Sequence, residues 1–206
     1  MTTPEWLDLL DWKRRVFDLY REIRLEPDPE AAWRRWRAVR DDLFATHPQS
    51  PLSPDARGSF GGLAYFGYDP SARVLAEIRP ADPASYALSG SDGTPYGATR
   101  VATASFALGG RASAVELYWL EGYGGGLFLS FADQTSGGET YGGGRYLLDT
   151  IKGADLGDRD GRLLLDFNFA YHPSCVYDSR WSCPLAPPGN RLPVPVRVGE
   201  RLGRDP

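Results

Sequence analysis

The sequence predicts a mainly β fold of the α+β kind: an antiparallel β-barrel or barrel-like sandwich with two N-terminal helices packed on it. The chain carries 24 glycines and 17 prolines among 206 residues, and 13% of its residues are aromatic. That combination favours many short strands joined by tight turns over a bundle of helices. Helical periodicity is confined to residues 1–46, and from Ser59 onward the apolar residues alternate as they do in strands.

Two helices are predicted at the N-terminus. Thr3-Pro4-Glu5 is typical of a helix start, with Thr3 as the N-cap, and Asp28-Pro29-Glu30 repeats the pattern. The first helix should end near Leu25. The second should stop before His47-Pro48, because the residue ahead of a proline avoids helical geometry. Apolar residues recur every three or four positions along both: Trp6, Leu9, Leu10, Phe17, Tyr20 and Ile23, then Trp33, Trp36, Val39 and Leu43.

A β-rich body is predicted over residues 59–200. The Gly109-Gly110 pair between two strands suits a two-residue hairpin turn that needs positive φ angles. Leu192 to Val198 is expected as an edge strand, where proline is tolerated. The other candidate strands are Phe60 to Phe66, Arg73 to Ile78, Tyr86 to Ser89, Thr99 to Leu108, Ser113 to Leu120, Leu127 to Phe131 and Arg162 to Asn168.

The whole chain, residues 1–206, is expected to form one domain. No internal repeat or low-complexity linker divides it, and the helical segment 1–46 is too short to stand alone. The length is sufficient for a sizeable hydrophobic core.

Charge and composition narrow the partners and the location. A net charge of −4 and a pI of about 5.2 give no reason to expect nucleic acid, so the Arg and Trp mixture at residues 33–40 is interpreted as a solvated face opposite a buried stripe. No stretch approaches the roughly 18 apolar residues of a membrane helix, and we expect no membrane partner. The N-terminus shows no signal-peptide pattern, so we expect a reducing cytoplasm, where Cys175 and Cys183 would be thiols. Lys13 and Lys152 are the only lysines, which we attribute to genome composition.

Several short strings, taken in order, are similar to a known family. They are His47-Pro48-Gln49-Ser50-Pro51-Leu52, Phe131-Ala132-Asp133-Gln134-Thr135-Ser136-Gly137, Thr140-Tyr141-Gly142-Gly143-Gly144-Arg145-Tyr146, Leu165-Asp166-Phe167-Asn168-Phe169-Ala170-Tyr171, Cys183-Pro184 and Asn190-Arg191-Leu192-Pro193. Together they resemble the bacterial and archaeal family catalogued as domain of unknown function 1684, over nearly the whole chain. The resemblance implies no activity, because the family is named for lacking one. His172 departs from the Asn that the family pattern leads us to expect after Tyr171.

The strongest candidate site is the polar, glycine-rich segment at residues 133–146, together with Asp166 and Asn168, which strand alternation places on one face. Glycines allow a close approach of backbone N–H groups, and Arg145 offers a planar fork to a carboxylate or phosphate. We therefore expect a pocket for a small ligand, with an enzyme acting on a small anionic molecule as one form of it. The candidate catalytic residues are His47, Asp133 and Asp166, and the candidate ligand-binding residues are Thr135, Ser136, Glu139, Tyr141, Arg145 and Asn168.

A structural alternative stands beside this site. In it, residues 133–138 are a hydrogen-bonded turn, and Arg145 pairs with Asp166 only to hold the fold. The substitution Arg145→Ala separates the two: a binding residue can be removed from a folded protein, whereas a buried ion-pair partner cannot.

Familiar catalytic strings are absent, so the sequence identifies no cofactor and leaves open whether the protein is an enzyme. There is no G-x-x-x-x-G-K-[ST], G-x-G-x-x-G, H-E-x-x-H, C-x-x-C or G-x-S-x-G.

Two functions of other classes remain open. Cys175, Cys183 and His47 supply ligand types that suit zinc or iron, although seven residues separate the cysteines. A local disulfide between the two cysteines and a plain helix-capping role for His47 are the structural alternatives. The proline-rich tail from Pro184 to Pro195, or the Trp-bearing helices, would instead serve a protein-interaction module.

Overall fold

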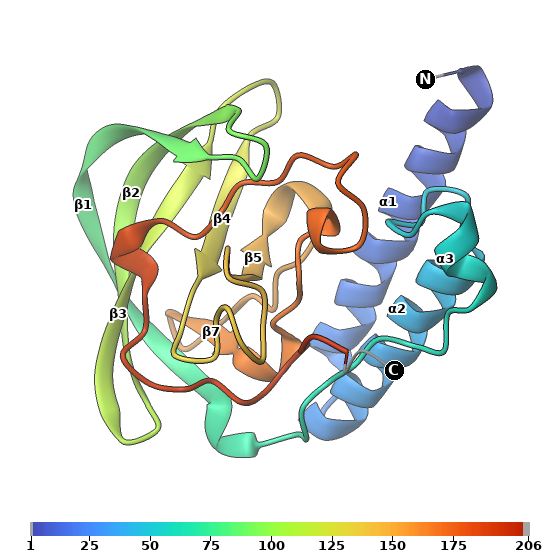
Figure 1. Cartoon of the computed structure of the whole chain (residues 1–206). Helices are drawn as coiled ribbons and strands as arrows, with labels where there is room; N and C mark the ends of the chain where they lie inside the picture. Colours follow the sequence, from blue (N-terminus) through green and yellow to red (C-terminus); the bar gives the residue numbers. More distant parts are fainter. Residues whose placement is uncertain (1, 204–206) are drawn as a thin grey trace.

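The two helices form a hairpin that lies along one side of the molecule (Figure 1). The structure is a computed structural model, and it describes residues 2–203. Helix α1 (Thr3–Leu25) has Thr2 as its N-cap, one residue before the predicted Thr3. Helix α2 (Pro29–Thr46) is capped by the side chain of Asp28 and ends with His47 as its C-cap, so both predicted helices are confirmed.

The body is one seven-stranded sheet in which every pair of neighbouring strands is antiparallel. The sheet curls without closing, since β5 and β6 lie at its two ends. The predicted class, a mainly β barrel-like sandwich with two N-terminal helices packed on it, is confirmed. The order across the sheet is β5-β4-β3-β2-β1-β7-β6, with bounds β1 Arg73–Ser89, β2 Pro95–Leu108, β3 Arg111–Leu120, β4 Gly126–Phe131, β5 Arg145–Asp149, β6 Asp158–Arg159 and β7 Arg162–Asp166.

Most predicted strands are present, with one difference in the first hairpin. The segments at residues 73–78 and 86–89 belong to one long strand, because a register shift between Pro80 and Ala84 lets β1 bend and continue past its prolines. The Gly109-Gly110 turn is confirmed, as both residues have positive φ and Leu108 pairs with Arg111.

Two predicted strands are wrong. Residues 60–66 form a loop with a single bridge, from Tyr65 to Glu200. Leu192 to Val198 buries every second side chain, but most of its backbone N–H groups take no part in strand pairing. Only Arg191, just before it, forms a bridge to the sheet, at Ala132. Alternating burial thus arises there without strand pairing.

Several elements of the structure were not predicted from the sequence. Strand β5 is buried on both faces, so it lacks the alternation that marks a half-exposed strand. The short helices have too few residues to show periodicity: α3 (Pro54–Gly58) and the 3₁₀ turns Pro70–Ala72, Thr150–Lys152, Phe167–Phe169, Ser174–Val176 and Pro188–Asn190.

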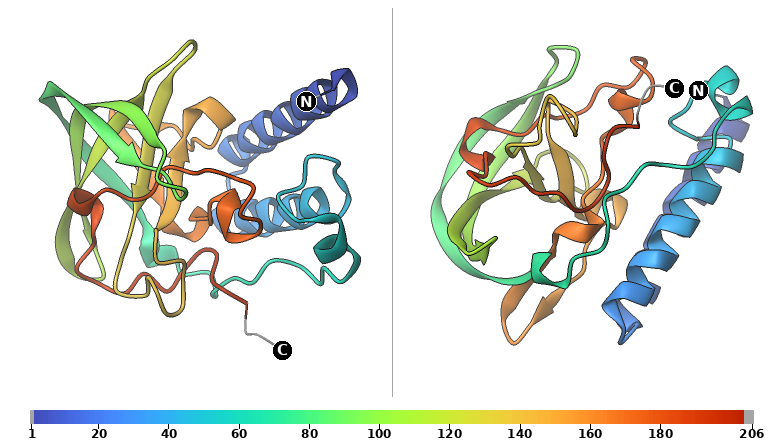
Figure 2. Two further views of the ribbon diagram at one scale, coloured as in Figure 1. Left: turned by 45° about the horizontal axis from the view of Figure 1, so that its top comes forward. Right: turned by 60° about the horizontal axis from the view of Figure 1, so that its bottom comes forward.

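The core has two main parts. One fills the curl of the sheet and includes Phe131, Leu165 and Phe167. The other joins the helical hairpin to the body, where Trp36 of α2 packs against Phe169 with ring centroids 5.2 Å apart. The further views show the hairpin as a separate layer beside the curled sheet (Figure 2). Within residues 2–203, no helix is both long and apolar enough to cross a membrane.

Candidate functional site

The predicted polar segment closes on itself. Asp133 begins the turn, and its Oδ1 accepts hydrogen bonds from the backbone N–H of Thr135 at 2.7 Å and of Val196 at 3.2 Å. Ser136 Oγ accepts from the N–H of Asp133 at 3.0 Å. The hydroxyls of Thr135 and Thr140 bond to each other at 2.9 Å, and both residues are buried. These are the bonds of a rigid turn, as in the structural alternative.

Arg145 lies at the centre of this turn and is fully buried. Its Nη2 contacts Asp133 Oδ2 at 2.9 Å and the carbonyl oxygen of Val196 at 2.7 Å, while Nη1 donates to the carbonyls of Val198 and Glu200. Burial lowers the pKa of Arg145, and the Asp133 carboxylate opposes that shift. The guanidinium therefore binds the C-terminal tail to the turn, and its exposed fraction of 0% leaves no surface to a dissolved anion.

Asp166 and Asn168 form a second network with different partners. Asn168 bonds the backbone of Asp69 with both ends of its amide, at 2.9 and 2.8 Å, and donates to Asp166 Oδ1 at 2.8 Å. Asp166 Oδ2 lies 3.3 Å from Arg73 Nη1, so the predicted pairing of Asp166 with Arg145 is wrong. Burial raises the pKa of Asp166.

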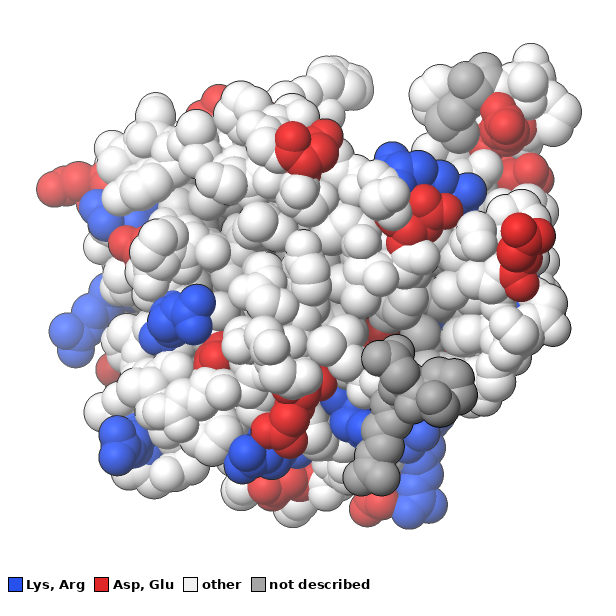
Figure 3. Space-filling view, in the orientation of Figure 1, with Lys and Arg blue, Asp and Glu red and all other residues white. Residues whose placement is uncertain are grey.

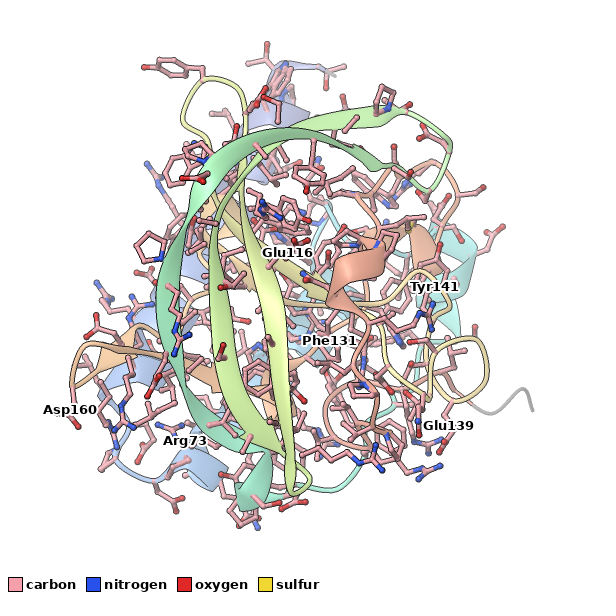
Figure 4. All side chains as sticks on the ribbon, turned by 90° about the vertical axis from the view of Figure 1, so that its left-hand side faces the viewer. Arg73, Glu116, Phe131, Glu139, Tyr141 and Asp160 are labelled. Carbon is pink, nitrogen blue, oxygen red and sulfur yellow. The ribbon has the colours of Figure 1, made fainter. Side chains whose placement is uncertain are left out.

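The two networks lie apart, so the predicted cluster is not one pocket. In Figure 4, Arg73, at the start of β1, lies far from Glu139 and Tyr141. Glu139 is exposed and pairs with Arg197 at 3.0 Å.

His47 caps α2 from a buried position. Its Nε2 lies 3.2 Å from Asp11 Oδ2 on α1, and its Nδ1 accepts from the N–H of Gln49 at 3.0 Å. The same contact is the main reason that the pKa of Asp11 is lowered. Both ring nitrogens are thus engaged in joining the helices to the following loop, which is the capping role.

The cysteines are free thiols, and Cys175 Sγ lies 4.0 Å from the Tyr141 hydroxyl. Among residues 2–203, no group of three or more His, Cys, Asp or Glu side chains is arranged to hold a metal ion. The geometry therefore does not bring His47 to the cysteines, as the metal alternative requires.

A cavity of about 240 Å³ lies between the helical hairpin and the body. Its walls are mostly aromatic and aliphatic. They come from α1, from α2 and the loop after it, from the start of β5 and the turn after that strand, and from the coil that begins at residue 171. The apolar lining residues include Leu9, Trp12, Val16, Leu19, Trp36, Leu43, Phe44, Tyr146, Ala154, Tyr171, Pro173 and Trp181. Such a concave, largely apolar space with a few polar groups is the usual form of a small-molecule site.

Both lysines of the chain line this cavity. Lys13 is exposed on α1 and has no ion pair within residues 2–203. Lys152 is half exposed, and its Nζ lies 3.4 Å from Asp149 Oδ2 and 5.9 Å from the centre of the Tyr146 ring. Over the face seen in Figure 3, basic and acidic side chains are interspersed, without a large patch of one sign. The two lysines, in contrast, line the same cavity.

Arg40 and His172 line the cavity, and both lie next to the buried carboxylate of Glu200. Arg40 Nη2 lies 2.8 Å from Glu200 Oε2, and burial raises the pKa of that glutamate. His172 Nε2 accepts from the N–H of Tyr141 at 3.2 Å. Burial, together with the cations of Arg145 and Arg40, lowers the pKa of His172 to about 3, so its ring is neutral.

None of the nine predicted site residues lines the cavity: His47, Asp133, Thr135, Ser136, Glu139, Tyr141, Arg145, Asp166 and Asn168. His172 and Cys183 do line it, although neither is among the predicted catalytic or ligand-binding residues, and Cys183 was considered only as a thiol or a metal ligand. The signal that was present was the pair of lysines in a chain whose other basic residues are arginine.

Fold and cavity together define a class of protein: a curled antiparallel sheet with an N-terminal helical hairpin that encloses an apolar cavity. Residues 58–201 match the family described as "Protein of unknown function (DUF1684)", and the chain belongs to this family. The resemblance expected from its motifs is thereby confirmed.

A solved structure extends the comparison. The chain is similar to an uncharacterised protein from gene locus rrnAC0354 of Haloarcula marismortui, solved by solution NMR, with 38% sequence identity and a TM-score of 0.61. The alignment covers 84% of this chain and 94% of that one. A comparison with functionally curated proteins finds no match.

Proposed function

We propose that this protein binds a small molecule with an apolar body and an anionic group in the cavity between the helical hairpin and the sheet. The predicted function, a pocket for a small anionic ligand, is kept, but its place moves from the Arg145 segment to this cavity. The proposal concerns binding and assigns no reaction. The expected cytoplasmic location remains a prediction beside it.

The apolar walls support the first half of the proposal. Trp12 and Phe44 face each other across helices α1 and α2 with ring centroids 6.3 Å apart, and both line the cavity. Apolar surface of this kind gains about 25 cal/mol for each Å² that a ligand removes from water. A cavity of about 240 Å³ suits a ligand of modest size.

The two lysines support the second half, and their position is the observation that carries the proposal. Lys13 places a positive charge beside the cavity, and no acidic side chain within residues 2–203 forms an ion pair with it. An ammonium group on a flexible stem attracts an anion without demanding one geometry. Because both lysines are partly solvated, their effect should weaken as salt is added.

The test is a titration of the protein with octanoate at low salt, followed by the fluorescence of the tryptophans that line the cavity. Val16→Trp fills the space and should abolish binding. Lys13→Gln should weaken binding by about two- to fivefold, the range of one exposed charge pair. Arg14→Gln removes the same charge from the next residue of α1, which does not line the cavity, and should leave the affinity unchanged. Equal effects of Lys13→Gln and Arg14→Gln would count against a specific anion site, and unchanged binding in Val16→Trp would place the ligand elsewhere.

A further inference from the structure

Two hydroxyl groups at the buried side of the cavity have hydrogens without an acceptor. Tyr20 OH accepts from Trp36 Nε1 at 3.1 Å, but within residues 2–203 nothing accepts its own hydrogen. Tyr171 OH takes part in no hydrogen bond within the same range, and its residue lines the cavity. Burial raises the pKa of Tyr20 to about 12 and also raises the pKa of Tyr171 well above its ordinary value, so both phenols keep their protons and act as donors.

Arg40 adds a third donor beside them. Its Nη2 is bound to Glu200 and its Nε lies 3.4 Å from Tyr65 OH, whereas Nη1 has no acceptor within the part of the chain that the structure describes. The guanidinium is held between aromatic rings, 4.9 Å from the centres of both Trp36 and Tyr171. This packing fixes its plane, so the free N–H groups have a fixed direction.

These donors act on one another electrostatically. The cation of Arg40 lowers the pKa of both Tyr20 and Tyr171 against the larger effect of burial, and Tyr20 and Tyr171 also interact. All three residues line the cavity, so a molecule inside it can accept the hydrogens that the chain leaves unpaired. Three such donors in a cavity with mostly apolar walls suit a ligand that carries a pair of oxygens.

We propose that Arg40, Tyr20 and Tyr171 form a head-group subsite that binds a carboxylate, so that the ligand is a monocarboxylic acid whose apolar body lies against Trp12 and Phe44. This inference rests on the function proposed above and names the class of ligand. A carboxylate has the two coplanar oxygens that a guanidinium edge and two hydroxyls bind well. A head with two charges, such as a phosphate, suits the site less, because Glu200 already pairs with Arg40 and Asp149 acts on both phenols.

The experiment compares acids with their primary amides by calorimetry. The panel is butanoate, octanoate and 3-phenylpropanoate, each with the matching amide, and the proteins are wild type, Tyr20→Phe, Tyr171→Phe and Tyr68→Phe. Wild type should prefer the acid. Tyr20→Phe and Tyr171→Phe each remove one donor and should lower the acid affinity by about tenfold, as expected for a hydrogen bond to a charged group. Tyr68 does not line the cavity, and Tyr68→Phe should bind as wild type does.

The ratio of acid affinity to amide affinity separates the subsite from a structural role. A general loosening of the cavity weakens acid and amide alike, whereas loss of the subsite lowers the ratio. If the ratio is the same in wild type and in both cavity variants, the head-group subsite is wrong, even though block of every ligand by Val16→Trp would still support the cavity. If no member of the panel binds wild type, the proposed function fails and this inference fails with it.

Discussion

The polar turn around Arg145 and the cavity beneath the helical hairpin differ in how they use charge. In the turn, Arg145 meets one carboxylate and three carbonyls of its own chain, and the whole group is buried. In the cavity, Lys13, Arg40 Nη1 and two tyrosine hydroxyls lack acceptors within residues 2–203. Arg145 Nε is buried without a partner within residues 2–203, but Nη1 and Nη2 are bound inside the fold and solvent does not reach the group. The donors of the cavity, in contrast, line a space that a ligand can enter. Density of polar residues therefore does not by itself mark a binding site, whereas donors that face a cavity do.

The substitution Arg145→Met tests whether the turn is a structural element, and we expect it to have the largest effect of the variants below. The change leaves Asp133 buried without its cation and takes the donors from the tail carbonyls, so we expect a loss of about 3–5 kcal/mol in the free energy of unfolding. Urea unfolding measures it.

Arg197→Met is the matched control, since Arg197 also joins the tail to the turn, at Glu139, but on the surface. Its unfolding midpoint should stay near that of wild type. An Arg145→Met protein as stable as wild type that no longer binds ligand would restore Arg145 as the anion-binding residue.

The glycine run offers a second, smaller test. Gly144 has a φ of +93°, and a Cβ there would lie 2.5 Å from the carbonyl oxygen of Phe131, so Gly144→Ala should cost about 2–4 kcal/mol. At Gly142 the nearest atom to a Cβ is 3.7 Å away, and Gly142→Ala should cost much less. Thermal and urea unfolding of the two variants compare them directly. If Gly144→Ala keeps full stability and loses only binding, the run serves a ligand after all.

The smallest expected effect concerns His172 and pH. Because its pKa is about 3 in the folded protein and near 6.5 when unfolded, the unfolded chain takes up a proton first as pH falls. His172 therefore removes stability as pH falls from about 6.5 towards 3, by about 2 kcal/mol between pH 7 and pH 5. Glu200 and Asp166 act in the opposite direction, since their raised pKa values add stability as pH falls.

His172→Asn isolates the histidine, because the two acids remain in both proteins. The variant should lose less stability than wild type between pH 7 and pH 5, as measured by urea unfolding at each pH. Parallel pH profiles for the two proteins would mean that His172 takes up its proton over the same pH range in the folded and the unfolded state, so that folding does not lower its pKa.

Much of the fold was predictable from local patterns. A proline and an acid after Thr or Asp predicted both helix starts, and the His47-Pro48 step predicted the end of α2. Gly109-Gly110 predicted a hairpin turn. Strand β5 was missed because it is buried on both sides, and the tail at residues 192–198 looked like a strand because it buries alternate valines without pairing.

The site was harder to predict than the fold, because the residues that line the cavity have the sequence pattern of an ordinary hydrophobic core. Leu9 and Tyr20 of α1 and Trp36 of α2 belong to the predicted apolar stripes, and a stripe predicts burial without revealing that the packed helices leave a space. The partner of Arg145 was equally hidden, because Asp133 and Asp166 are both compatible with it in sequence and only the path of the chain decides between them.

The two walls of the cavity come from different parts of the chain. The matched region begins at residue 58, so it contains the sheet and the coil after it, whereas α1 and α2 precede it. A change in either helix can widen, narrow or recharge the cavity without touching a strand or the turn around Arg145. The hairpin meets the body through side-chain packing and not through strand pairing, so the shape and charge of the cavity can be altered independently of the register of the sheet.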